Sequence, residues 1–143
     1  TTIDAVGDAR GDDVLRLIGE KLNAVSASDD EFRARLLGRI YEENTDVARF
    51  VLTTLAEDAM TKETWADLWR QEKNHFVWTI EHILPQGENL PAAWQEMLGG
   101  KEVAMQVQEE HRHKLGNLTI TAYNSNLGNK SFVEKRDPVW TGA

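Results

Sequence analysis

The chain has 143 residues, no cysteine and a formal net charge of −8. This length fits one domain with its own core, and the lack of cysteine excludes disulfides, thiolate zinc sites and a cysteine nucleophile. The acidic balance argues against a general nucleic-acid binder. The chain starts in mid-pattern without a signal peptide, and no apolar run approaches the roughly 20 residues of a membrane span. We therefore expect a fragment of a longer protein that has no membrane contact, and the lack of cysteine fits a reducing cytoplasm.

The first half of the chain, residues 1–75, predicts a layer of four helices. In each, apolar residues recur at helical spacing after residues that cap helices well. The expected starts are Asp12 or Asp13, Asp29 or Asp30, Asn44 or Thr45, and Thr61. In the fourth helix, Trp65, Leu68 and Trp69 form an i, i+3, i+4 stripe. We interpret these apolar residues as core.

The pattern changes at Phe76, where strand-forming residues run into the pair Glu81-His82. Residues 117–121 alternate and suit a second strand that pairs with the first. Between the strands, residues 88–114 predict an insertion of two helices, with Val103, Met105 and Val107 inward. A final helix should carry Phe132 and Lys135. The expected fold class is α+β: a mostly helical domain with a ββα unit at 76–137.

One part of this acidic chain is basic. Residues 1–100 carry 10 Lys or Arg against 19 Asp or Glu, whereas residues 111–136 carry five basic residues against Glu134 alone. A solvated face is the usual interpretation of such a cluster, and contact with nucleic-acid phosphate is the alternative.

Three segments of the chain, taken in order, resemble the motif of a known protein family. The first is Glu81-His82 followed by Pro85, the second is Asn117-Leu118 with the strand after it, and the third is Asn126, nine residues after Asn117. Their order and spacing resemble the HNH motif, also called the ββα-metal or His-Me finger, of nucleases. More narrowly, EHILPQ with LGNLTITAYNSNLGNKSF is similar to the C-terminal domain of GmrSD-type modification-dependent restriction enzymes, which include SspE-type phosphorothioate-sensing phage-defence nucleases.

The residues suit metal-dependent hydrolysis of a phosphodiester. An imidazole titrates near pH ~6.5, so His82 can activate water near neutral pH. The side-chain oxygens of Glu81 and Asn126 suit Mg²⁺ or Mn²⁺ better than Zn²⁺. The resemblance implies a single metal between Glu81, Asn126 and the scissile phosphate. Because side chains alternate along a strand, a bend at the strand end is needed to bring Glu81 and His82 to one site.

The resemblance also implies roles for further residues and partners. Asn117 is counted with His82 and Asn126 among the candidate catalytic residues, because its amide would tie down the loop after His82. The expected contacts with double-stranded DNA come from Arg112, His113, Lys114, Lys130, Lys135 and Arg136. The family resembled places an N-terminal, modification-sensing NTPase domain before the nuclease domain.

Each interpretation has a plain alternative. His82 could be a core or surface histidine, Glu81 a surface carboxylate paired with Lys or Arg, and Asn126 a helix cap. The whole domain could be a catalytically silent DNA-binding or regulatory module that keeps the HNH shape. A third alternative is a protein-interaction domain whose partner patch consists of Trp65, Trp69 and Trp94.

Overall fold

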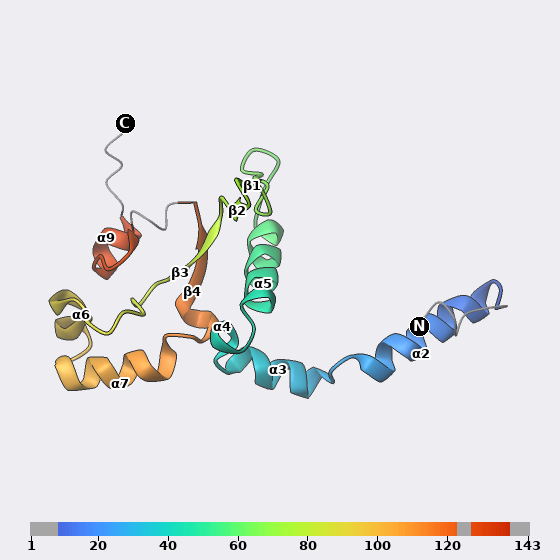
Figure 1. The fold of residues 1–143 in the computed structure, drawn as a ribbon, viewed down its shortest axis with the longest axis horizontal. Coiled ribbons are helices and arrows are strands. Elements are labelled where there is room, and N and C mark those ends of the chain that lie inside the picture. Colours follow the sequence, from blue (N-terminus) through green and yellow to red (C-terminus); the bar gives the residue numbers. More distant parts are fainter. Residues whose placement is uncertain (1–8, 123–126, 138–143) are drawn as a thin grey trace. The chain divides into compact units, whose positions relative to one another are not determined.

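The structure, a computed structural model, describes residues 9–122 and 127–137 (Figure 1). It has the expected α+β fold class, mostly helical with small two-stranded sheets in the described part. The chain forms two compact units, Thr1–Arg35 and Leu36–Ala143. None of the described helices is both long and apolar enough to cross a membrane.

The first unit contains α2 (Asp12–Val25) and most of α3 (Asp29–Leu37), and α3 begins at Asp29 as predicted. The prediction that Asp12 or Asp13 caps α2 was wrong, because its N-cap is Gly11 without a side-chain cap hydrogen bond, and both aspartates lie in the first turn. Aspartates in the first turn of each helix favour these starts by interacting with the helix dipole. The prediction of a core role was wrong for Leu15 and Leu22, which are 71% and 55% exposed. Helical spacing predicts a helix with an apolar side, but it does not predict the surface against which that side packs.

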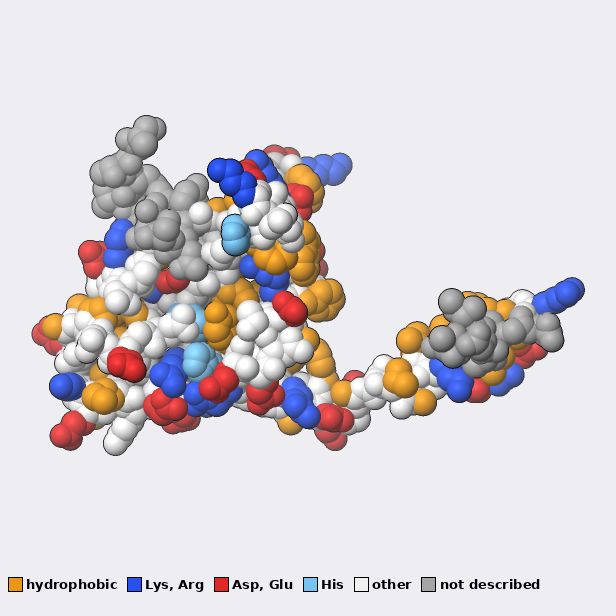
Figure 2. Space-filling model, in the orientation of Figure 1, with side chains coloured by type: hydrophobic (Ala, Val, Ile, Leu, Met, Phe, Trp, Pro, Cys, Tyr) orange, Lys and Arg blue, Asp and Glu red, His pale blue; other side chains and the backbone are white. Residues whose placement is uncertain are grey.

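The second unit begins with α4 (Ile40–Glu43) and α5 (Thr45–Asp58), of which α4 was not expected. The side chain of Asn44 accepts a hydrogen bond from the Val47 N–H at 3.1 Å, so the predicted cap of α5 is confirmed. The buried side of these helices packs against the β3–β4 sheet in one cluster: Ile40, Ala48, Leu52, Ile80 and Leu118. Hydrophobic side chains gather over α5 in Figure 2. On this helix, Phe50 and Leu55 are each 59% exposed.

The predicted fourth helix does not form. Residues 61–70 make turns instead, because side chains bond to nearby backbone groups and so compete with a helix. The Thr61 N–H donates to Thr64 Oγ1 at 2.8 Å, and the Trp69 N–H donates to Asp67 Oδ1 at 3.0 Å. Trp65 is consequently 70% exposed, whereas Leu68 is buried.

The turns lead into a short hairpin of β1 (Gln71–Glu72) and β2 (His75–Phe76). Its two connecting residues, Lys73 and Asn74, have φ values of 50° and 64°, which two-residue hairpin loops require. This hairpin shortens the predicted strand, because β2 ends at Phe76 and the next strand begins only at Thr79.

The strand that matters for the site is β3 (Thr79–His82), paired antiparallel with β4 (Leu118–Thr121) as predicted. In the register, Glu81 lies opposite Thr119 and His82 opposite Leu118. A 3₁₀ turn, η1 (Leu115–Asn117), leads into β4, and α9 (Phe132–Arg136) follows it. The strand–strand–helix order of the expected ββα unit is thus present.

The insertion between β3 and β4 contains α6 (Ala92–Met97) and α7 (Lys101–His111). They pack around a second core cluster of Leu84, Leu90, Trp94 and Ala104. Trp94 is only 4% exposed, so the structure removes it from the suggested partner patch. The inward prediction was also wrong for Val103 and Met105, which are 45% and 51% exposed; Ala104 and Gln108 are buried instead.

Candidate active site

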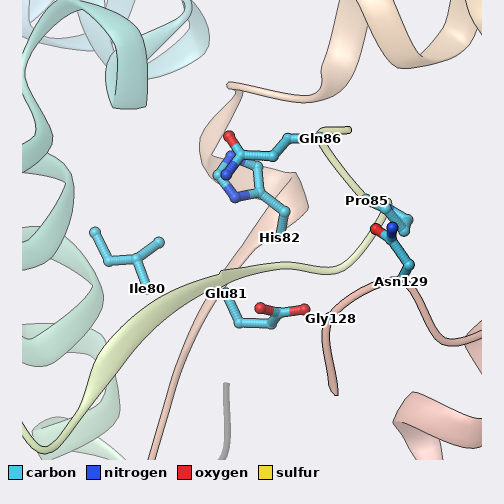
Figure 3. A pocket seen from close by; sticks show the side chains of 7 residues that line it. All are labelled: Ile80, Glu81, His82, Pro85, Gln86, Gly128 and Asn129. Atoms are coloured by element: carbon cyan, nitrogen blue, oxygen red, sulfur yellow. The ribbon is translucent and has the colours of Figure 1, made fainter. Parts of the chain in front are cut away.

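The end of β3 carries the two central side chains of the candidate site. Glu81 and His82 are 6% and 5% exposed, and their side chains leave the strand on opposite sides (Figure 3). The strand is regular from Glu81 to His82, and the predicted bend follows at Ile83 and Leu84, where the Ile83 N–H donates to the Asn117 carbonyl at 2.8 Å. Both residues nevertheless line one pocket of about 160 Å³, together with Ile80, Pro85, Gln86, Gly128 and Asn129.

Two aromatic side chains that no motif linked to His82 lie against its imidazole ring. Tyr41 meets it edge-on with 4.6 Å between ring centroids, and His113 meets it edge-on at 5.6 Å. Tyr41 and His113 are themselves stacked, and the Tyr41 N–H donates to the His113 carbonyl at 3.2 Å. Tyr41 belongs to α4, and no motif pointed to it, because only the packing of α4 against the sheet brings it here.

These surroundings keep His82 neutral. Burial, and then the nearby His113, Lys135 and Arg112, lower the pKa of His82 from 6.5 to about 4. Its Nε2 atom is buried and has no hydrogen-bond partner within the described ranges. A neutral imidazole with a nitrogen free to accept a proton is what a general base requires.

The Glu81 carboxylate has a partner from α9. Lys135 Nζ donates to Glu81 Oε1 at 2.6 Å and to the His82 carbonyl oxygen at 2.7 Å. The two side chains are 8% and 7% exposed, so this is a buried ion pair. The lysine expected at the DNA backbone thus makes its hydrogen bonds at the site itself, and Glu81 is paired as in the alternative interpretation, although it is not on the surface.

Asn117 ties down the loop after His82, as the resemblance implied. Its Oδ1 accepts from the Leu84 N–H at 2.7 Å, and its Nδ2 donates at 3.0 Å to the carbonyls of Leu84 and Arg112. One side chain therefore holds the loop after β3 to the chain segment before β4. Its effect on a reaction stays a prediction.

The chain matches one known protein family over most of its length. The family of GmrSD restriction endonucleases, C-terminal domain, matches residues 26–140 of the chain. The chain belongs to this family. Searches among curated proteins and among solved structures find no match. The domain is therefore a nuclease domain of the restriction-endonuclease class, whose substrate is DNA.

The described part of the site offers oxygen donors that a metal could use. Among the described residues, no three or more His, Cys, Asp or Glu side chains gather closely enough to hold a metal ion. Asn126, the second predicted ligand, lies outside the described residues. The Glu81 carboxylate and the Asn129 amide line the pocket (Figure 3), and such oxygens suit Mg²⁺ or Mn²⁺. The Lys135 ammonium is paired with Glu81, so a metal ion would meet a carboxylate that already has a cation beside it.

The other predicted DNA contacts of the GmrSD C-terminal domain lie in surface ion pairs or beside the site. Arg112 pairs with Glu109 at 3.0 Å, Lys114 pairs with Glu110 at 3.2 Å, and Arg136 pairs with Asp137. Exposed pairs of this kind are weak and screened by salt, so they can exchange for phosphate. Lys130 is exposed before α9, and the contact of each residue with DNA stays a prediction.

Proposed function

We propose that this domain is a metal-dependent DNA endonuclease in which His82 activates water for phosphodiester hydrolysis. The observation that carries the proposal is the buried, neutral His82, whose Nε2 has no hydrogen-bond partner in the described part of the chain and which shares a pocket with the Glu81 carboxylate. Nucleophilic attack on a phosphodiester needs a base that is unprotonated at neutral pH, and the lowered pKa of His82 meets this need.

The residues have separate roles in the proposed reaction. His82 accepts the proton of the attacking water at Nε2, while Tyr41 and His113 keep its ring in place. Glu81, with Asn126, would hold Mg²⁺ or Mn²⁺, which supplies positive charge to the phosphate as negative charge develops there. Asn117 holds the loop that follows His82.

The biological setting is also part of the proposal. We infer a bacterial modification-dependent restriction or anti-phage protein, of which this domain nicks or cuts double-stranded DNA. The net charge of −8 favours weak DNA binding by the domain alone. An N-terminal, modification-sensing NTPase domain would then bring it to DNA, with phosphorothioate as a candidate modification.

Supercoiled plasmid incubated with the chain and Mg²⁺ or Mn²⁺, with and without EDTA, tests the activity. We expect nicking that EDTA abolishes, and a loss of about 100-fold or more in His82→Ala, since general-base groups contribute about 10²–10⁴-fold. His75→Ala is the matched control, because His75 is an exposed histidine in β2. Full activity of a folded His82→Ala protein would remove His82 from the mechanism, and no EDTA-sensitive nicking by the wild type would favour the silent DNA-binding module.

A further inference from the structure

The Lys135–Glu81 pair is more than a surface contact. Both side chains are at least nine-tenths buried, and the ammonium makes two hydrogen bonds, to Glu81 Oε1 at 2.6 Å and to the His82 carbonyl at 2.7 Å. A buried carboxylate is costly unless a cation balances it. Lys135 therefore supplies the charge that balances the Glu81 carboxylate within β3.

The short helix α9 is anchored in a way that aims Lys135 at this position. Trp94 Nε1 donates to the Lys130 carbonyl at 2.9 Å, and the Trp94 ring lies edge-on to Phe132 at 6.0 Å. Ser131 and Glu134 then form a capping box that starts the helix. The buried insertion thus holds the start of α9, and Lys135 follows one turn later.

The Glu81 carboxylate is also the metal ligand of the proposed function. The Lys135 ammonium and the metal ion would therefore share one carboxylate. Two positive charges within a few ångströms in a partly buried site repel each other strongly. A divalent cation that coordinates both oxygens of Glu81 must therefore displace the ammonium from Oε1, and one that coordinates Oε2 alone is repelled by the neighbouring ammonium. The flexible four-carbon stem of lysine permits this movement, and the His82 carbonyl remains as a second acceptor.

We propose that Lys135 is a resident counter-ion that competes with the divalent cation for Glu81, so that metal enters the site only in exchange for the ammonium. This inference rests on the proposed role of Glu81 as a metal ligand. The exchange lowers the affinity for free metal and links metal binding to the position of α9. Lys135 is in this sense a positioning residue, which acts through Glu81 and the end of β3.

Calorimetric titration of the full 143-residue chain with Mn²⁺, without DNA, tests the competition. Lys135→Gln should bind Mn²⁺ at least about tenfold more tightly than the wild type, because no ammonium has to leave. Lys135→Arg, which keeps the charge, should stay close to the wild type. Lys130→Gln is the matched control, since it removes the same charge from an exposed residue near α9, and it should change the affinity by less than about twofold. Unchanged or weaker Mn²⁺ binding by folded Lys135→Gln would overturn the proposal.

Two further measurements separate this inference from the proposed function. Glu81→Gln should abolish Mn²⁺ binding in both the wild-type and the Lys135→Gln backgrounds; if binding persists, the metal site of the proposed function is wrong. If Lys135→Gln does not fold, the Lys135 side-chain amine signal can be followed by NMR in the wild type during a Mg²⁺ titration. A shift of that signal with metal occupancy supports the exchange, and an unmoved signal at full occupancy overturns it.

Discussion

His82 and Glu81 are both buried at the end of β3, but the structure treats the charge of the two side chains differently. His82 and Glu81 are neighbours in the chain, nearly equally buried, and directed to opposite sides. His82 lies against Tyr41 and His113 and is neutral, because burial and nearby cations favour the neutral imidazole. Glu81 receives Lys135 as a partner instead. The end of one strand therefore carries a neutral imidazole on one side and a carboxylate paired with a cation on the other.

The largest expected effect comes from removing one partner of the Lys135–Glu81 ion pair. Lys135→Ala leaves the Glu81 carboxylate buried without a counter-ion, and we expect it to lower the free energy of unfolding by roughly 3–5 kcal/mol. The double variant Glu81→Gln/Lys135→Gln should recover most of this loss, because no lone charge remains. Urea denaturation measures both. A Lys135→Ala protein as stable as the wild type would mean that the pair does not hold α9 to β3.

The next largest effect is expected at Asn117, whose side chain holds the loop after β3 to the segment before β4. Asn117→Ala removes the partners of the buried Leu84 N–H and carbonyl, and leaving such groups unsatisfied should destabilise the domain by about 2–3 kcal/mol. Plasmid nicking should fall as well, since the loop after His82 loses its anchor. Denaturation and nicking assays on one preparation check both effects. Asn44→Ala, which removes the cap of α5 instead, is a control that should cost about 1 kcal/mol and leave the activity per folded molecule unchanged.

The neutral His82 side chain predicts a particular dependence of folding stability on pH. The pKa of His82 is about 4 in the folded chain and near 6.5 when unfolded. Below pH 6.5 the unfolded state therefore binds a proton more readily than the folded state does, so the His82 contribution to stability falls from pH 6.5 towards pH 4. NMR titration of the His82 imidazole signals should give a midpoint of about 4. A His82 midpoint near 6.5 would show that the ring is not desolvated as the structure has it.

The smallest effect is expected at the ring beside His82. Tyr41→Leu keeps an apolar side chain but loses the edge-on aromatic contact, which is worth about 0.5–1.5 kcal/mol. Tyr41→Phe keeps that contact and should resemble the wild type. Thermal unfolding and plasmid nicking of the two variants form the measurement. Equal losses in both would point to the hydroxyl instead of the ring.

Local patterns predicted much of the fold. The starts of α3 and α5, the pairing of β3 with β4 and the final helix followed from spacing and capping residues, which act over a few positions. The segment from Thr61 to Arg70 was mispredicted, because side chains of Thr64 and Asp67 bond to the backbone and outcompete a helical stripe of tryptophans.

By itself, the sequence determined which chemical groups are available and in what order: Glu81-His82, then Asn117, with the spacing typical of the family. Only the tertiary structure decided that His82 is neutral, that Tyr41 adjoins it, and that Lys135 neutralises Glu81 from 54 positions away. The physical reason is that desolvation and ion pairing depend on all atoms around a group. Those atoms come from α4, the insertion and α9, which meet only when the chain folds.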